Sequence, residues 1–498
     1  MNSNSLSWTT KITKIILFII GVSYFVVYLL IVFNRITYPF ELEWIEGSMV
    51  DHVIRILSGQ KLYVAPSLQF VPFLYTPLYY YLAAVASKIL GVGFIPLRLV
   101  SFLSSLGCLF IIFLITKKET ASAYWGIIAS SLFAATYRIG GAWFDIARVD
   151  SLYLFLLLVA LYIVKFHDSA KSYIFAGILI SLSFLTKQTA MYVLLPLMVY
   201  CAVFKGCRSL FFIVPAVLIT GISTLLLNYI HDGWYNYYIF EVPLFAPFVK
   251  ENIIKFWTKD MLSHLPVAFS LSTFYVVVQM VKGRKNNYCF YILTVIGLFG
   301  GAWLSRIRTG GYDNVLIPPY AIISVLWGLG LHAVFKLIQS SSEYRQKLME
   351  MFIYLVCFFQ FASLIYNPFN QIPSKMDLEA GNTFINFLST FKGDILVPDH
   401  SYLPTLAGKK SCAHEAAVGD VLSSGKAKLA HEIPKAIQEK RFSAIILDEM
   451  RFPFWSSELK LYYTVHCMKY KSPTEFRPVT GGPTRPSLFC LPKKNNAN

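Results

Sequence analysis

The sequence predicts a polytopic helical membrane protein. Of its 498 residues, 56% are hydrophobic and only 14% are charged, whereas soluble domains carry about 25% charged residues. Apolar runs of roughly 18–22 residues recur between positions 12 and 366, and each is long enough to cross a bilayer as an α-helix. The excess positive charge, +17, lies largely in short loops between these runs. This pattern is typical of positive-inside topology and argues against a nucleic-acid partner.

Placing the basic loops on the cytoplasmic side gives about eleven spans. The first, residues 13–33, has no small-residue cleavage site and is expected to remain as an anchor. The other spans are expected at residues 98–116, 121–138, 150–167, 172–187, 189–204, 208–229, 262–282, 287–304, 315–338 and 348–366. Residues 35–97 then form a first outer loop, and the C-terminal region is extracytoplasmic.

Two segments of this outer loop are predicted to be helices that do not cross. Residues 76–90 are apolar but only about 15 residues long, and crossing would invert every later loop, so an interfacial or re-entrant helix is expected. Residues 46–58 place an apolar stripe on one side and charged residues on the others, which favours a juxtamembrane helix lying flat. That stripe consists of Ile45, Met49, Val53 and Leu57.

The C-terminal part has a different composition. After residue 369 the charge rises, and short apolar strands at 394–397 and 443–447 alternate with helical patterns at 416–422 and 427–439. Such alternation predicts a small α/β domain. The expected organisation is a membrane module at 1–369 and a soluble extracytoplasmic domain at 370–498.

Acidic residues are concentrated directly after the first span. The residues are Glu41, Glu43, Glu46 and Asp51. A carboxylate at the membrane surface can serve as a general base toward an acceptor hydroxyl or amine, and partial burial would raise its pKa into a useful range. The alternative is that these acids are solvated loop charges or partners of a helix N-terminus.

Three further sets of polar or aromatic residues are expected on the same outer side. Asp145, Arg148 and Asp150 could pair with one another, or they could orient an acceptor or a phosphate. The outward cations Lys187, Arg306 and Arg308 break the positive-inside trend, so they are candidates for binding a lipid phosphate; the alternative is headgroup contact or snorkelling. The aromatic residues fit an interfacial belt or sugar stacking, and the stacking candidates are Tyr75, Tyr79 and Trp234.

Several kinds of site find no support in the sequence. It contains no Walker A motif, no G-x-G-x-x-G after a strand and no H-E-x-x-H. The spacing of the eight cysteines fits no zinc motif. No metal site and no cofactor are predicted, and a requirement for a divalent metal stays open.

The order of these motifs resembles the GT-C class of integral-membrane glycosyltransferases, in the branch of protein O-mannosyltransferases and lipid A aminoarabinose transferases. In that family an acidic Asp-Glu motif in the first outer loop precedes an amphipathic helix, a Gly, a Tyr and a Pro-Leu helix. The matching positions here are Glu46-Gly47, Gly59, Tyr63, Pro77-Leu78, Gly91, Arg98, Asp150, and Gly310 to Asn314 with Pro318. The resemblance covers roughly residues 10–340.

One departure concerns the base. The spacing places Glu46 at the family's Glu and Ile45 at its Asp, so the choice between Glu43 and Glu46 as the catalytic carboxylate stays open. The resemblance implies a glycosyltransferase of a bacterial inner membrane that acts on the outer face. It implies a polyprenyl-phosphate-linked hexose or pentose as donor, with inversion at the anomeric carbon, and a cell-envelope glycan, lipid or protein as acceptor.

In this interpretation Glu41, Asp51, Asp145 and Asp150 are supporting or acceptor-binding acids, and Lys187, Arg306 and Arg308 hold the donor phosphate. The runner-up hypothesis is a polytopic transporter or lipid flippase, which would require mid-membrane polar residues and repeated halves.

Overall fold

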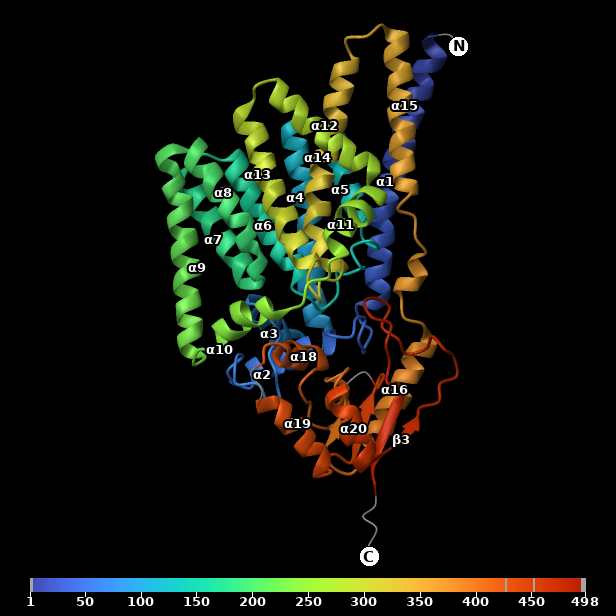
Figure 1. Cartoon of the computed structure of the whole chain (residues 1–498). Coiled ribbons are helices and arrows are strands. Elements are labelled where there is room, and N and C mark those ends of the chain that lie inside the picture. Colours follow the sequence, from blue (N-terminus) through green and yellow to red (C-terminus); the bar gives the residue numbers. More distant parts are fainter. Residues whose placement is uncertain (1–2, 426–427, 451–452, 494–498) are drawn as a thin grey trace, which may run out of the picture.

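The computed structural model describes residues 3–425, 428–450 and 453–493. Within these residues, eleven helices form one bundle (Figure 1). They are α1 (Ser3–Arg35), α4 (Phe94–Thr120), α5 (Ala123–Ala135), α6 (Asp150–Phe166), α7 (Ala170–Thr186), α8 (Met191–Phe204), α9 (Leu210–Ile230), α12 (Pro266–Val281), α13 (Lys285–Arg306), α14 (Ile317–Ile338) and α15 (Glu343–Ala362). The bundle of apolar helices expected from the sequence is confirmed.

The bundle helices differ in length more than the sequence analysis expected. Five of them are long and apolar enough to cross a membrane, or six if the pair Asn252–Ser263 and Pro266–Val281, bent by 96°, is counted as one span. Several others are shorter apolar helices, such as α5 with 13 residues and α7 with 17. At about 1.5 Å per residue these helices fall short of a hydrocarbon core about 30 Å thick.

Two helices of the first outer loop lie at one end of the bundle. They are α2 (Glu46–Leu57) and α3 (Leu78–Leu90). Figure 1 shows both beside the C-terminal region, with the N-terminus at the opposite end. As expected, residues 76–90 do not run through the bundle. We call the end that carries α2 and α3 the site end, and the end at the start of α1 the basic end.

The segment between α9 and α12 begins at the site end, where Figure 1 shows α10 near α2 and α3, and it returns into the bundle at α11. It is built from α10 (Trp234–Asn236), a π-helical turn at Tyr237–Glu241, a 3-10 turn at Val242–Phe245, α11 (Asn252–Lys255) and a second π-helical stretch at Phe256–Ser263. Short 3-10 turns occupy other connections, at Gln188–Ala190, Gly206–Ser209, Asp313–Leu316 and Pro368–Gln371.

The C-terminal region contains a small mixed sheet covered by helices. Its strands β1 (Ile395–Leu396), β2 (Ala444–Leu447), β3 (Tyr463–Cys467) and β4 (Leu488–Pro492) are arranged in the order β1-β2-β4-β3. Strand β2 pairs parallel with β1 and antiparallel with β4, and β4 pairs antiparallel with β3. The helices are α16 (Lys375–Ser389), α17 (Leu403–Leu406), α18 (Glu415–Ser423), α19 (Lys428–Gln438) and α20 (Pro453–Tyr462).

Helix α2 packs against protein, not lipid. Its stripe residues Met49 and Val53 are fully buried, and they share one hydrophobic core with α3, Tyr402 and Val418. Burying each such side chain contributes about 1.5–3 kcal/mol. The stripe that the sequence suggested for a membrane surface therefore docks the C-terminal region onto the first outer loop.

Candidate active site

The acidic segment, residues 41–51, is folded into the protein at the site end. Glu41, Glu43 and Glu46 expose 6%, 0% and 0% of their surface. Carboxylates buried to this degree need hydrogen-bond or charge partners. The interpretation of these acids as solvated loop charges does not fit the structure, and their partners indicate what each one does.

Glu46 is held on both oxygens. The Arg98 guanidinium donates from Nε to Oε1 at 3.0 Å and from Nη2 to Oε2 at 2.7 Å. The backbone N–H groups of Ala147 and Leu42 complete the set at 2.6 and 2.7 Å. Burial alone would raise the pKa of Glu46, but Arg98 and these hydrogen bonds hold that pKa below its ordinary value. Glu46 is thus a charged anchor that joins the outer loop to α4 and to the loop before α6.

Glu43 is only partly satisfied. Its Oε2 accepts from Arg148 Nη1 at 3.0 Å and from the Ile45 N–H at 3.3 Å, whereas its buried Oε1 has no hydrogen-bond partner. Burial raises the pKa of Glu43 to about 7, against the opposing charge of Arg148. A carboxylate with this pKa and one unoccupied oxygen can accept a proton near neutral pH.

The C-terminal region closes over Glu43. Gly481, with φ of +73°, lies so near that a Cβ there would approach Glu43 Cγ at 2.8 Å. The neighbouring Thr480 donates its backbone N–H to the Leu42 carbonyl at 3.1 Å, and its hydroxyl accepts from Trp143 Nε1 at 3.0 Å. Glu43 therefore lies between the first outer loop and a segment more than four hundred residues later in the chain.

Glu41 is joined to the C-terminal sheet through a histidine. His400 Nδ1 bonds Glu41 Oε2, and its Nε2 bonds Asp448 Oδ2 at 3.0 Å. All three side chains are buried. Burial would lower the pKa of His400, but Asp448 and Glu41 outweigh it and raise that pKa well above its ordinary value. A protonated imidazole between two carboxylates thus links the outer loop to the end of β2.

Asp51 makes a second link to the same region. The Ser401 hydroxyl donates to Asp51 Oδ2 at 2.7 Å. Burial raises the pKa of Asp51 to about 7, and the hydrogen bond from Ser401 opposes this shift. Asp51 therefore faces the C-terminal region, on the side of α2 that docks against it.

Asp145 fixes the end of α1. Arg35 grips it with two bonds, from Nε to Oδ2 at 2.8 Å and from Nη2 to Oδ1 at 2.6 Å, and the Tyr137 hydroxyl donates to Oδ1 at 3.0 Å. Arg148, three residues later, points to Glu43 and also donates to the Tyr75 hydroxyl at 2.7 Å. Internal pairing within the set 145–150, one of the two alternatives left open by the sequence, is not what the structure has, because each charge pairs with a distant element.

Asp150 begins α6 beside a lysine and an amide. Its Oδ1 accepts from Lys187 Nζ at 2.6 Å and from Asn314 Nδ2 at 3.0 Å. Its Oδ2 and the Asn314 carbonyl oxygen are buried without a hydrogen-bond partner. An acid at this position is favoured by the positive end of the helix dipole. The cluster at the site end therefore contains one cation, Lys187, and two buried acceptor oxygens, Asp150 Oδ2 and Asn314 Oδ1, that accept no hydrogen bond.

The other two candidate cations are engaged elsewhere at the site end. Arg306 grips Asp260 with two bonds, at 2.9 and 3.2 Å, and it forms an ion pair with Asp313 at 3.1 Å. Arg308 donates to backbone carbonyls of residues 243, 244 and 246, and in the described part of the chain no salt bridge joins it to a carboxylate. The charge of Arg308 is thus the less neutralised of the two.

The three stacking candidates have different environments. Tyr79 is fully buried, and its hydroxyl donates to the Leu97 carbonyl at 2.9 Å. Tyr75 is half-buried against Arg148, whose guanidinium lies 5.5 Å from the ring centroid. Trp234 is half-buried and packs edge-on against Tyr237 at 5.3 Å. Tyr75 is therefore the candidate that shares Arg148 with Glu43.

Sequence reasoning missed most partners of the acids. Arg35 and Arg98 were not assigned an ionic role, and His400, Ser401 and Asp448 were not considered as neighbours of the first outer loop. A usable signal existed for the arginines, because a cation at the edge of a long apolar helix needs a buried partner. The residues of the C-terminal region carried no comparable signal, since only the fold brings them to the loop.

The site is closely packed in this structure. A cavity beside Glu41 and His400 measures only about 10 Å³. Among the described residues no group of three His, Cys, Asp or Glu side chains is arranged to hold a metal ion. A much larger cavity lies at the basic end and is described below.

Comparisons with known proteins agree with the expected resemblance. Residues 74–230 match the family model described as dolichyl-phosphate-mannose-protein mannosyltransferase. No curated protein sequence matches the chain. The fold is similar to that of ArnT from Cupriavidus metallidurans bound to undecaprenyl phosphate, with a TM-score of 0.59 at 12% identity over 96% of this chain and 97% of that one.

A second similar structure is that of an archaeal enzyme. The oligosaccharyltransferase AglB from Archaeoglobus fulgidus, in complex with an inhibitory peptide and a dolichol-phosphate, aligns with a TM-score of 0.54 at 12% identity. The alignment covers 94% of this chain and 74% of that one. The chain is an integral membrane protein with a GT-C fold, as its sequence predicted.

Proposed function

We propose that this chain is a glycosyltransferase that moves a sugar from a polyprenyl-phosphate donor to an acceptor at the extracytoplasmic face of the membrane. The observation that carries the proposal is Glu43, a buried carboxylate with one unoccupied oxygen and a raised pKa, in a GT-C fold. The bound undecaprenyl phosphate of ArnT and the dolichol-phosphate of AglB support the donor class. The matching family model supports the reaction class.

The proposed reaction is a single displacement at the anomeric carbon. An acceptor hydroxyl or amine gives its proton to Glu43 Oε1, and the acceptor atom forms the new glycosidic bond. The bond from the anomeric carbon to the phosphate oxygen breaks, and polyprenyl phosphate leaves with the electron pair. One displacement inverts the anomeric configuration, and general-base assistance of this kind contributes about 10²–10⁴-fold.

Glu43 suits the base role better than Glu46. Glu46 has no free oxygen, and Arg98 keeps its pKa low, so protonation there is unfavourable. Glu43 shares its charge with Arg148 but keeps Oε1 unpaired. The family's Asp position is Ile45 here, which cannot accept a proton. We infer that Glu43, two residues earlier, replaces it.

The donor phosphate would bind at cations of the site end. Lys187 lies against Asp150, and the phosphate would share or replace that carboxylate as its partner. Arg308 has the least neutralised charge, and Arg306 would contribute once its bonds to Asp260 rearrange. These cations would stabilise the negative charge that grows on the leaving phosphate.

The remaining acids are proposed to support the site. Glu41 and Asp51 hold the first outer loop against the C-terminal region, and Asp145 fixes the loop before α6 to the end of α1. Asp150 positions Lys187 and Asn314. Tyr75 is the preferred sugar-stacking residue. Tyr79 and Trp234 would need to move to reach a ligand.

The orientation is inferred from charge. The loops after α4, α6, α8, α12 and α14 all lie at the basic end. These loops and the helix turns next to them carry Lys117, Lys118, Lys165, Lys171, Lys205, Arg208, Lys282, Lys285 and Lys336. Positive-inside topology then makes the basic end cytoplasmic and the site end extracytoplasmic. We propose the cytoplasmic membrane of a bacterium as the location. Residues 370–498 form a separate unit there that shapes acceptor access.

Donor turnover by the purified full-length protein tests this function. The protein in detergent is given labelled polyprenyl-phosphate hexose and pentose donors with a cell-envelope extract as acceptor source, and released polyprenyl phosphate is measured. We expect release from at least one donor, together with label in the extract. Folded protein that consumes none of these donors, and that instead moves a lipid between leaflets of vesicles, would contradict the proposal.

A further inference from the structure

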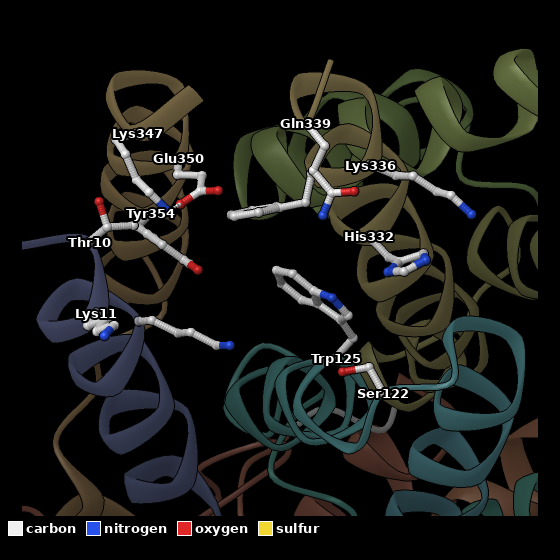
Figure 2. Close-up of a pocket in the computed structure, with 12 residues that line it drawn as sticks. Thr10, Lys11, Ser122, Trp125, His332, Lys336, Gln339, Lys347, Glu350 and Tyr354 are labelled. Atoms are coloured by element: carbon white, nitrogen blue, oxygen red, sulfur yellow. Dashed lines mark hydrogen bonds and ion pairs between the residues drawn. The ribbon is translucent and has the colours of Figure 1, made fainter. Parts of the chain in front are cut away.

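A cavity lies at the basic end, opposite the acidic segment. It measures about 440 Å³, which is within the range of about 300–1,000 Å³ common for small-ligand sites. It is lined by Thr10, Lys11, Lys14, Ser122, Trp125, His332, Phe335, Lys336, Gln339, Lys347, Glu350 and Tyr354. Figure 2 shows that α1 and α15 contribute residues on one side and α14 on the other, with Trp125 of α5 between them.

The lining is strongly basic, and its one carboxylate is already paired. Glu350 accepts from Lys347 Nζ at 3.3 Å and from Gln346 Nε2 at 2.8 Å. Among the described residues, no salt bridge joins Lys11, Lys14 or Lys336 to a carboxylate. These three lysines are exposed, and in the described part of the chain their ammonium groups border one cavity without a carboxylate partner.

The inner wall of the cavity is aromatic and rigid. Trp125 and Tyr354 are buried, and Phe335 packs between them with centroid distances of 4.9 and 5.2 Å. The three rings come from α5, α14 and α15 and form one continuous aromatic face of the cavity. A site with an apolar wall and a cationic rim fits a ligand with a charged head and an apolar or neutral body.

We propose that this cavity binds a phosphate group, carried by an anionic phospholipid headgroup or by a free phosphate compound. Lysine ammonium groups bind phosphate as point charges and do not require the planar fork of arginine. The cavity is lined by residues of α1, α14 and α15 at the basic end, so a lipid could place its phosphate among the lysines and its chains along these helices. This site is separate from the proposed active site and does not depend on the proposed function.

Lipid binding to the purified full-length protein tests the proposal. Native mass spectrometry compares the occupancy of phosphatidylglycerol with that of phosphatidylcholine, which has no net charge. The variant K11Q/K336Q removes two cavity lysines that have no acid partner. The control K282Q/K285Q removes the same charge from the exposed turn between α12 and α13 at the same end. The variant K14Q removes the third cavity lysine by itself. The melting temperature of each variant in the same detergent shows whether a change in lipid binding comes from misfolding.

The wild type is expected to prefer phosphatidylglycerol. Since each lysine near a lipid surface contributes about 1 kcal/mol, K11Q/K336Q should lower this preference about tenfold or more, with K14Q in the same direction and the control unchanged. Displacement of the lipid by millimolar inorganic phosphate would identify a free phosphate compound as the ligand, and resistance would identify the lipid. Equal binding of the two lipids by the wild type, or equal loss in K11Q/K336Q and K282Q/K285Q, would overturn the proposal.

Discussion

At the scale of residues, two glutamates three positions apart have opposite environments. Glu46 binds Arg98 and two backbone N–H groups and stays ionised, whereas Glu43 keeps one oxygen unpaired and has a raised pKa. The first arrangement holds the loop in place, and the second is suited to proton transfer. The two roles differ because Arg98 binds both oxygens of Glu46, whereas Arg148 binds only Oε2 of Glu43.

Removing Arg98 tests the anchoring role. The substitution Arg98→Met leaves Glu46 buried without its charge partner, which is expected to destabilise the protein by about 3–5 kcal/mol. Thermal unfolding in one detergent measures the effect. The matched control is Lys61→Met, which breaks an exposed pair with Asp232, where 47% and 69% of the two side chains are accessible. That pair is expected to contribute about 0–1 kcal/mol. Equal melting temperatures of the Arg98→Met and Lys61→Met variants would contradict the anchoring role.

The sequence indicated that the acids at 41–51 are important, but it could not choose between Glu43 and Glu46. The choice depends on Arg98 and Arg148, which lie about fifty and one hundred residues later in the chain. A pattern along the chain does not reveal which oxygen each guanidinium meets. The base role of Glu43 stays a prediction until it is tested.

At the scale of elements, α2 is the contact between the membrane bundle and the C-terminal region. One face carries Met49 and Val53 into a shared core, and Asp51 bonds Ser401. Gly47 in its first turn lets Glu41 and Tyr402 approach the helix backbone. The position of the acidic segment therefore depends on how the C-terminal region packs against α2.

Adding a methyl group at Gly47 tests this contact. In Gly47→Ala the new Cβ would overlap Glu41 Oε1 and would meet Tyr402 Cβ at 2.8 Å, so the two parts must shift apart. Overpacking of this kind costs about 1–3 kcal/mol. Limited proteolysis should then cut the junction near residue 370 faster than in wild type. Gly419→Ala, in α18, has nothing within 4 Å of its Cβ and should leave the rate unchanged. Equal rates in both variants would count against the contact.

The helical elements could be predicted well because apolar length and loop charge determine them. Residues 76–90 are too short to cross, and the structure places them at the site end. The strands β3 and β4 were missed because their hydrophobic patterns are weak: β3 exposes four of its five residues, and β4 fully buries only one of its five. The docking of α2 could not be predicted, since a buried stripe and a membrane-facing stripe have the same sequence pattern.

At the scale of the whole molecule, the two ends have different chemistry. The basic end has uncompensated lysines around a cavity, and the site end has buried acids paired with arginines and a histidine. A protein with such ends is expected to take one orientation in the membrane.

Two native cysteines can report that orientation. Cys467 in β3 and Cys207 in the turn at Gly206–Ser209 are both exposed, and they lie at opposite ends. A membrane-impermeant maleimide on intact cells should label Cys467, and it should label Cys207 only after permeabilisation. The variants Cys467→Ser and Cys207→Ser identify the two signals. Labelling of Cys207 first in intact cells would reverse the proposed topology.

The central claim is that Glu43 is the general base, and the pH dependence of sugar transfer tests it most directly. The initial rate is measured with saturating polyprenyl-phosphate donor for wild type and for Glu43→Gln, with equal melting temperatures as a control for folding. A protonated base accepts no proton, so the wild-type rate should fall as pH falls through about 7. Glu43→Gln should be about 10²–10⁴-fold slower at every pH above that value. Transfer by Glu43→Gln at the wild-type rate, with the same pH profile, would contradict the account.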